Sequence, residues 1–470
     1  MKKILSVLIL VFIATVSCTT KYKDVQSFET VWQKASAEDV GLNPALMDRL
    51  IQDAHEGRFP NLHALIVVKD SRIVVEEYFG EFDAKTSHYT ASVTKSVGSM
   101  LVGIAMDQGL LPGLDDGVLD MRLSDLFPEY QEILSADPRK ADIRFRHILS
   151  MSAGFEWDED TYPYDDQRND WVRVRDASEP ASLVLEQRVA HNPGKVFNYS
   201  GGLSILLAYL IERETDMGAA AFAKRYLFEP LGISDYEWKN LTGGLIDFPG
   251  GLSLRPRDMV KLGQLYLNGG RWNGESIVSK AWVTESTREH IISINSPNYG
   301  FQWWCGKFYY QDRSVYLYMA SGHGGQKIFV VPDFSLVVIL AHKVFDNPAG
   351  EMHNTAIMSR YILPASDPFN PREVPVEVGI ETLSHFVGAY ASSNGHFKIN
   401  IHNGRLKVTA QNTESMYLVP ISRARFRGTV KDMIDVEFVF DITDDGKVQG
   451  GWISYAFAKD SFVRVLKDSK

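Results

Sequence analysis

The sequence predicts an α+β fold: an antiparallel sheet flanked by helices, with an inserted helical subdomain, followed by a small all-β domain. Three observations predict it. β-rich runs come early and return after about residue 284, whereas residues 123–284 read as helices and long loops. A segment with two prolines at 366–372 reads as a linker that separates this part from the C-terminal region. That last region alternates hydrophobic and polar residues with period two, which is typical of strands.

The N-terminus predicts export. Lys2-Lys3 precede an apolar stretch over residues 4–16, shorter than the roughly 20 residues that a membrane-spanning helix needs. Ser17-Cys18 then resembles a bacterial lipoprotein cleavage site, with Cys18 as the acylated residue. Thr15 stands where leucine is usual, so cleavage by an ordinary signal peptidase stays an alternative. We therefore expect a signal peptide over 1–18, a lipid membrane as partner through acylated Cys18, and a tether over 19–39.

The most informative segment is Ser92-Val93-Thr94-Lys95, which follows a predicted hairpin of strands 62–69 and 72–79. The small and apolar residues from Ser96 to Met106 predict a buried helix that starts at Ser92. Side chains three apart on a helix are neighbours, so the Lys95 amine can reach the Ser92 hydroxyl. Burial and the positive end of the helix dipole both lower a lysine pKa, and a neutral lysine can take the serine proton. The segment predicts a nucleophile beside its base, although one chance Ser-x-x-Lys in so long a chain would be unremarkable.

Two further polar segments follow in order. Asn198-Tyr199-Ser200-Gly201 closes a loop just before an apolar helix over 203–211. Ser321-Gly322-His323-Gly324-Gly325-Gln326 leads into a predicted strand over 327–331. Other strands are predicted at 300–305, 315–319 and 336–342. We expect these elements to form one domain over 40–365.

Together the three segments resemble the serine hydrolases of the class C β-lactamase and penicillin-binding protein superfamily, whose pattern is Ser-x-x-Lys, Tyr-x-Asn, then Lys-Thr-Gly or His-x-Gly. The likeness runs from about Trp32 to Leu340. Segments such as Arg146–Gly154, Leu254–Met259 and Tyr299–Trp304 look like the esterase and nylon-oligomer (aminohexanoate-dimer) hydrolase branch. The resemblance implies a β-lactamase-like fold with Ser92 between the sheet and the helical subdomain.

The resemblance also implies roles for the later segments. Tyr199 would relay a proton to the leaving group and back from water. The backbone N–H groups of Ser92 and Gln326 would form the oxyanion hole. His323 would contact substrate or merely pack, and Gly324 and Gly325 would let substrate lie against the strand.

Two departures from the family pattern concern the substrate. Gly201 replaces the asparagine that holds an acyl-amide group, and His323-Gly324-Gly325 stand where β-lactamases carry Lys-Thr-Gly. Both weaken the case for β-lactam hydrolysis. The acidic and aromatic loop 157–166 looks like a cover of the site, as in the nylon-oligomer hydrolases, and a solvated acidic loop is the alternative. Its candidate substrate contacts, together with one acid just beyond it, are Tyr162, Tyr164, Asp165 and Asp170.

Past the linker, predicted over 366–379, residues 380–470 predict a small β-domain. The strands around Asn403-Gly404 make a tight hairpin, and a long alternating strand ends before Asp444-Asp445-Gly446. The domain is similar to the barrel-like, lipocalin-like domains appended to some members of the superfamily. It could cover the active site, bind substrate or simply pack.

Composition and the remaining motifs exclude other classes. With 45% hydrophobic and 23% charged residues the chain is an ordinary globular protein, and a net charge of −10 without basic runs beyond the N-terminus argues against nucleic acid. No Gly-x-Ser-x-Gly, His-Glu-x-x-His or nucleotide-binding motif occurs, so we expect no metal and no cofactor. The sequence predicts an exported serine hydrolase that cleaves a small amide or ester. The alternatives are a peptidoglycan D,D-peptidase or β-lactamase, or a non-catalytic binding or sensing protein on the same fold.

Overall fold

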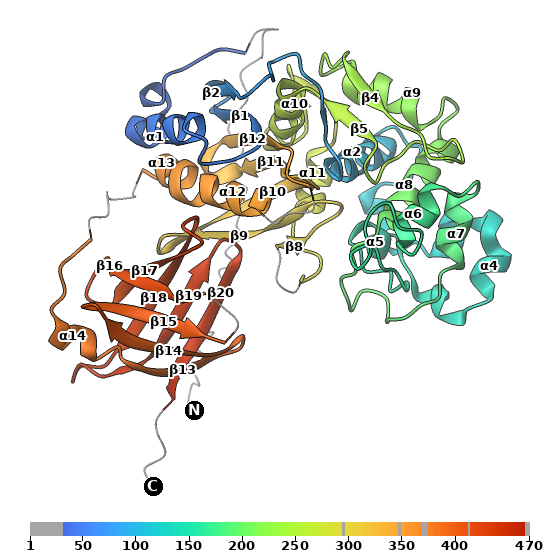
Figure 1. Cartoon of the computed structure of the whole chain (residues 1–470). Coiled ribbons are helices and arrows are strands. Elements are labelled where there is room, and N and C mark those ends of the chain that lie inside the picture. The colour runs from blue at the N-terminus through green and yellow to red at the C-terminus, as the bar shows by residue number, and fades with distance from the viewer. Residues whose placement is uncertain (1–31, 294–296, 346–348, 369–374, 412–413, 466–470) are drawn as a thin grey trace, which may run out of the picture.

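The computed structural model describes residues 32–293, 297–345, 349–368, 375–411 and 414–465, so the predicted signal peptide and Cys18 lie outside the described residues. Its larger part combines a sheet with helices on both faces and a mainly helical region to one side, and a separate barrel follows at the C-terminus (Figure 1). This agrees with the predicted fold class. Within the described part of the chain, no helix is long and apolar enough to cross a membrane.

The central sheet has seven antiparallel strands in the order β2-β1-β12-β11-β10-β9-β8. Their bounds are β1 Leu62–Lys69, β2 Arg72–Tyr78, β8 Asn298–Tyr299, β9 Trp304–Tyr310, β10 Arg313–Gly322, β11 Gln326–Val331 and β12 Leu336–His342. The β1-β2 hairpin turns at Asp70-Ser71, as predicted, and both residues have positive φ, which suits the turns that match the twist of a hairpin. Every residue of β11 and β12 is buried, because helices cover both faces of the sheet there.

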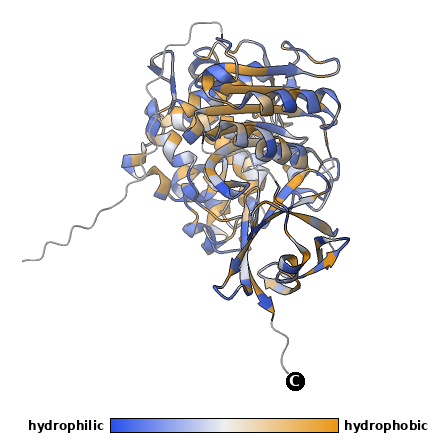
Figure 2. Ribbon diagram, turned by 90° about the vertical axis from the view of Figure 1, so that its left-hand side faces the viewer, coloured by the Kyte–Doolittle hydropathy of each residue, from blue (hydrophilic) through white to orange (hydrophobic). Residues whose placement is uncertain are grey.

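Alternate residues of the central strands enter two different hydrophobic cores. Ile66 and Val68 of β1 join the core that contains α2 (Val93–Asp107) and α10 (Pro256–Leu267). Leu65 and Val67 join the second core, formed with α1 (Pro44–His55) and α12 (Ala349–Ile357). This alternation explains why an unbroken apolar run forms a strand, since both of its faces are covered. Figure 2 shows the hydrophobic strands enclosed between helices.

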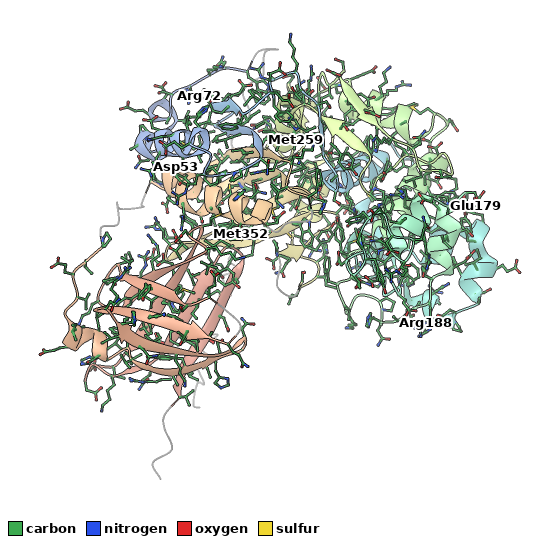
Figure 3. All side chains as sticks on the ribbon, viewed as in Figure 1. Asp53, Arg72, Glu179, Arg188, Met259 and Met352 are labelled. Atoms are coloured by element: carbon green, nitrogen blue, oxygen red, sulfur yellow. The ribbon has the colours of Figure 1, made fainter. Side chains whose placement is uncertain are left out.

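A buried polar contact fixes α1 to the helical turns that end the larger part of the chain. Asp53, labelled in Figure 3, accepts hydrogen bonds from Arg49 at 2.9 Å and from the Tyr361 hydroxyl at 2.5 Å. Tyr361 belongs to the π-helical turn Met358–Ile362, which continues into α13 (Leu363–Ser366). The predicted linker therefore begins where this helix ends.

The helical region surrounds two central helices, α2 and α8 (Gly201–Glu214), which contact each other. Its other helices are α3 Leu123–Leu126, α4 Gln131–Ser135, α5 Phe145–Leu149, α6 Asp170–Arg175, α7 Pro180–Glu186, α9 Ala219–Ala223 and α11 Lys280–Ser286. Every residue of α2 except Asp107 is buried. Its glycines allow this close packing, because a Cβ at Gly103 would lie 2.2 Å from the ring of Trp282. Three short strands, β3 His88–Tyr89, β4 Tyr236–Trp238 and β5 Leu252–Leu254, form a small sheet beside it.

The prediction of a strand over 300–305 is wrong for residues 300–303, which lie between β8 and β9. Gly300 N–H bonds to the carbonyl of Trp303 in a tight loop between β8 and β9. Phe301 and Gln302 donate instead to Ser286 and Leu149, which belong to other parts of the chain. The apolar composition of this segment reflects burial among helices rather than pairing with a neighbouring strand.

The C-terminal domain is a closed, eight-stranded antiparallel barrel. Its strands are β13 Gly388–Ser392, β14 Gly395–His402, β15 Arg405–Ala410, β16 Met416–Pro420, β17 Arg425–Val430, β18 Ile434–Ile442, β19 Val448–Tyr455 and β20 Ala458–Val465, preceded by α14 (Ile380–Ser384). Buried aromatic side chains, including Tyr390, Phe397, Phe438 and Phe462, fill its interior. The middle of this barrel is therefore a packed core.

The barrel docks on β9 through the β19-β20 hairpin. Tyr309 N–H donates to the Ala456 carbonyl at 2.5 Å, and Phe457 packs edge-on against Phe308 with ring centroids 4.9 Å apart. An ion pair between Arg360 and Asp435 at 2.5 Å adds a second contact. Among the described residues, none of the barrel lines the cavity at Ser92. Of the three roles suggested for the C-terminal domain, packing is the one for which the structure provides contacts.

Candidate active site

Ser92 stands at the N-terminus of α2 and lines a cavity of about 600 Å³. The residue before it, Ala91, has φ of 47°, a left-handed conformation that is unfavourable for a side chain with a Cβ. Thr94 supports this turn, because its hydroxyl donates to the Ala91 carbonyl at 2.6 Å. Backbone strain of this kind is found where a fold holds one side chain in a fixed orientation, and here that side chain is the Ser92 hydroxyl.

Lys95 lies one helical turn further on and is buried, with 4% of its surface exposed. Its Nζ donates to Ser92 Oγ at 3.1 Å and to the Pro249 carbonyl at 2.8 Å. The contact with Ser92 is the one that the three-residue spacing predicts. Burial lowers the pKa of Lys95, while the carboxyl groups of Glu159 and Asp247 oppose that shift. The lysine is thus placed to exchange a proton with the serine.

Tyr199 completes a group of three around Ser92. Its hydroxyl hydrogen-bonds to Ser92, and Lys95 Nζ lies 4.8 Å from the centre of its ring. The ring is stacked on Trp304 with centroids 5.8 Å apart. Burial raises the pKa of Tyr199, with the Ser92 hydrogen bond acting in the opposite sense, so the phenol keeps its proton at neutral pH. Asn198 fixes the loop by donating to the Trp157 carbonyl at 3.1 Å.

A buried acid that the sequence reading missed, Glu159, lies beside this group. Its Oε2 accepts hydrogen bonds from Gly201 N–H at 2.6 Å and from the Trp157 indole N–H at 2.7 Å. Burial raises the pKa of Glu159, and the charge of Lys95 lowers it. Gly201 leaves the space for this carboxyl, since a Cβ there would lie 3.1 Å from Glu159 Oε2. At the position where the family pattern has asparagine, this chain has Gly201, and the carboxyl group of Glu159 lies against it.

A second acid, Asp247, was also missed by sequence reasoning. It lies on the loop before β5, and its Oδ1 accepts from Gly250 N–H at 2.9 Å. Burial raises the pKa of Asp247 to about 6, against the opposing effects of backbone hydrogen bonds and of Lys95. No local motif marks either acid, because only the folded chain brings residues 159 and 247 to Lys95.

The predicted substrate-binding segment divides into two parts. Ser321, Gly322 and His323 line the cavity, and a Cβ at Gly322 would lie 2.1 Å from the Thr90 carbonyl, so the segment lies against the backbone that leads to Ser92. His323 also lies beside Tyr164, with ring centroids 5.7 Å apart.

Gly324, Gly325 and Gln326 do not line this cavity. Both glycines have positive φ in the turn between β10 and β11. They are covered by other side chains, because a Cβ on Gly324 would meet Phe345 at 2.6 Å and one on Gly325 would meet His342 at 2.9 Å. Gln326 is buried at the start of β11, and its side-chain amide donates to the His342 carbonyl. The roles predicted for the two glycines and for the Gln326 N–H stay predictions.

The loop 157–166 borders the cavity, as expected of a site cover, through Asp160 and Tyr164. The other candidates do not line it. Tyr162 stacks under the Arg168 guanidinium at 4.3 Å, and Asp170 accepts from the Asp158 N–H at 2.7 Å. These two side chains therefore have structural partners within the loop.

Comparison with known proteins agrees with this geometry. The profile of the Beta-lactamase family matches residues 47–361. The chain belongs to the Beta-lactamase family. Its members need not be β-lactamases, since sites of different specificity are built on one fold.

Relatives within the family carry hydrolase names. The 6-aminohexanoate-dimer hydrolase of Paenarthrobacter ureafaciens is 24% identical over 281 residues, covering 54% of this chain and 69% of that protein. A Salmonella typhi protein provisionally named a D-alanyl-D-alanine carboxypeptidase is 22% identical over 351 residues, covering 62% and 79%. An octameric penicillin-binding protein homologue from Pyrococcus abyssi has a similar fold, with a TM-score of 0.52, 17% identity and coverage of 89% of this chain and 99% of that one. The family and these relatives support a hydrolase of the β-lactamase fold.

Proposed function

We propose that this protein is an exported serine hydrolase that cleaves an amide or ester through a covalent acyl-enzyme on Ser92. The observation that carries the proposal is that the Ser92 hydroxyl contacts both the buried Lys95 amine, at 3.1 Å, and the Tyr199 hydroxyl. A nucleophile next to a base and a second proton carrier is the arrangement that acyl transfer requires.

In the acylation step, neutral Lys95 removes the Ser92 proton as Oγ attacks the substrate carbonyl carbon. The electron pair of the carbonyl moves to oxygen, which becomes an oxyanion. When the tetrahedral intermediate collapses, the bond to the leaving oxygen or nitrogen breaks, and that atom takes the proton of the Tyr199 hydroxyl. Tyr199 recovers a proton from Lys95, which is protonated at this stage. The raised pKa of Tyr199 suits this role, because the phenol holds its proton until the leaving group needs it.

Deacylation reverses the proton path. Tyr199 takes a proton from water as the water oxygen attacks the acyl carbon, and it passes its own proton to Lys95. The ester bond to Ser92 breaks, Oγ recovers a proton and the acid product leaves. Two carboxyl groups, Glu159 and Asp247, stabilise the lysine when it carries the proton.

For the oxyanion, we propose the backbone N–H of Ser92 together with that of His323. Gly322 lies against the Thr90 carbonyl, and His323 lines the cavity, so the peptide between them lies next to the backbone at the start of α2. Backbone donors fixed in this way stabilise developing charge without reorganising. The resemblance to the family implied Gln326 as the second donor, and its N–H is the alternative to that of His323.

A peptidoglycan D,D-peptidase or β-lactamase is the second candidate, supported by the name of the Salmonella relative. The site speaks against β-lactam turnover, because Gly201 lacks an amide and Glu159 brings an acid close to the place where that amide would be. A charge-assisted hydrogen bond contributes about 1.5 to 3 kcal/mol, so losing such contacts to a β-lactam costs several kcal/mol in the transition state. We expect ester turnover to exceed nitrocefin turnover by about 10³ in kcat/KM. Comparable kcat/KM values for the ester and for nitrocefin would favour the β-lactamase candidate.

The test of the mechanism uses three variants and one label. Ser92→Ala should abolish both p-nitrophenyl acetate hydrolysis and labelling by a fluorophosphonate, with an unchanged thermal transition. Lys95→Met and Tyr199→Phe should each lower kcat by at least about 10²-fold, the usual effect of losing a positioned proton carrier. Ser182→Ala, at a partly exposed position on α7 outside the lining of the cavity, serves as the control. Full activity of Ser92→Ala would mean that another residue is the nucleophile, and an inert wild-type protein would favour a binding or sensing role.

Export and lipid anchoring form a separate proposal, supported by the sequence of residues 1–18. Cys18→Ala should block incorporation of labelled palmitate in a bacterial host. Unchanged labelling would contradict the proposal of a lipid anchor at Cys18 and would not affect the proposal of a hydrolase.

A further inference from the structure

One wall of the cavity is apolar and continuous with Tyr199. Trp304 stacks on Tyr199, and Phe197 packs against Trp304 with ring centroids 5.6 Å apart. Val196 and Ile292 line the same cavity, and their sequence neighbours Lys195 and Ser293 line it too. We refer to Val196, Phe197, Ile292 and Trp304 as the apolar wall.

The outer part of the apolar wall is unusually exposed for such side chains. Val196 is 40% exposed and Ile292 is 76% exposed. A single exposed aliphatic residue is ordinary on a protein surface. Here two of them line the same cavity as Phe197 and Trp304, both partly buried, so the exposed surface continues inward toward Ser92. Apolar surface arranged around a polar reaction centre is the usual composition of a ligand site.

We propose that the apolar wall binds the leaving group of the substrate, and that this leaving group is an alcohol or amine with an apolar alkyl segment. The inference rests on the proposed function, in which Tyr199 protonates the departing atom. Because that atom must be within hydrogen-bond reach of the Tyr199 hydroxyl when the bond breaks, the rest of the leaving group extends along the surface beside Tyr199. That surface is the apolar wall.

The other side of the cavity has a different character and suits the acyl part. There Tyr164 lies beside His323, which in turn lies 5.4 Å from Phe345 between ring centroids. Asp160 also lines the cavity near this loop. In the reaction the acyl–oxygen or acyl–nitrogen bond breaks, the proton of Tyr199 passes to the leaving atom, and the alkyl alcohol or amine departs along Trp304 and Ile292. The acyl carbon forms its new bond to Ser92 Oγ in this step, and water then releases the acyl group as the acid.

The experiment measures kcat/KM of the full-length protein for acetate esters of straight-chain alcohols from ethanol to octanol, by release of acetate. Complete burial of a methylene contributes about 0.8 kcal/mol, equivalent to roughly fourfold in kcat/KM. Since the wall is open on one side, we expect about twofold per methylene. A matched series of ethyl esters of straight-chain acids should show a clearly smaller dependence on chain length.

Variants connect this dependence to the wall. Ile292→Ser and Val196→Ser should each reduce the rise of kcat/KM with alcohol length, because each removes apolar surface from the wall. Met217→Ser is the matched control, because Met217 is a similarly exposed apolar residue, at 39%, that does not line the cavity. Its length dependence should equal that of wild type.

Two results would overturn the inference. A flat response to alcohol length, with ethyl acetate turnover still dependent on Ser92, would remove the leaving-group subsite and leave the hydrolase mechanism standing. A steeper response in the acid series would show that the apolar wall takes the acyl chain. If turnover of every ester survived Ser92→Ala, the proposed function itself would fail.

Discussion

Replacing Glu159 by glutamine removes a charge from beside Lys95 without removing the acceptor that holds the loop. Both hydrogen bonds of Glu159 are made by one oxygen, from Gly201 N–H at 2.6 Å and from the Trp157 indole at 2.7 Å. The carbonyl oxygen of glutamine can accept both. The substitution therefore separates the charge of this residue from its contribution to packing.

The expected effect is on the pKa of Lys95. The carboxylate of Glu159 is the larger of the two charges that raise the pKa of this lysine against the effect of burial. An opposite charge favours the protonated lysine, so its removal lowers the pKa. Because neutral Lys95 is the proposed base, the midpoint of the acid limb of kcat/KM should move to lower pH.

The assay is the pH dependence of kcat/KM for p-nitrophenyl acetate with wild type, Glu159→Gln and Asp160→Asn. Asp160→Asn removes the same charge from an exposed neighbour on the cavity rim, where solvent screens it, so its acid limb should move much less. The thermal transition of Glu159→Gln should stay close to that of wild type. An acid limb displaced by less than about 0.3 units would mean that Glu159 is uncharged or uncoupled from Lys95, and the electrostatic role assigned to it would be wrong.

Three further predictions concern packing. Gly201→Asn places a side chain against Glu159 and against Trp171, which would lie 3.0 Å from a Cβ at this position. The substitution should therefore lower both stability and kcat. A variant as stable and active as wild type would contradict the close contact at this glycine. Gly103→Ala puts a Cβ 2.2 Å from Trp282 inside α2 and should destabilise the protein by about 1 to 3 kcal/mol in urea unfolding, whereas an unchanged midpoint would mean that the indole can move aside. Phe457→Ala removes the contact with Phe308 between barrel and sheet and should cost about 1 to 2 kcal/mol, below the 3 to 5 kcal/mol of a fully buried phenylalanine. Its control is Tyr455→Ala on the same hairpin, a residue that is 44% exposed, and equal losses for the two variants would show that the docking contact contributes little.

Local patterns were enough to predict the elements whose geometry is local. The hairpin of β1 and β2 is encoded by two β-rich runs around Asp70-Ser71. The contact between Ser92 and Lys95 follows from their spacing on one helix, since residues three apart face the same side. The period-two alternation of the C-terminal region likewise predicts strands without reference to the rest of the chain. These inferences hold because the interacting groups are separated by fewer than about ten residues.

Other parts of the site were decided by tertiary packing alone. Glu159 sits in an acidic loop that the sequence predicts to be either a cover of the site or a solvated loop, yet it is buried because Trp157 and Gly201 close around its carboxyl group. The composition of a loop predicts its average exposure, and no local pattern marks the one acid that folds inward. The strand predicted over 300–305 failed for a related reason, since Gln302 bonds to Leu149 rather than to a neighbouring strand.

The sequence by itself thus predicted the contact between Ser92 and Lys95, the strands on either side of them and the β-structure of the C-terminal domain. Only the tertiary structure decided that His323 rather than Gln326 lines the cavity, that Glu159 and Asp247 are the acids near Lys95, and that the barrel docks on β9. The physical reason is the range of the interactions. Hydrogen bonds along a helix or across a hairpin are fixed by residue spacing, whereas burial and the electrostatics of a site depend on segments that meet only when the whole chain packs.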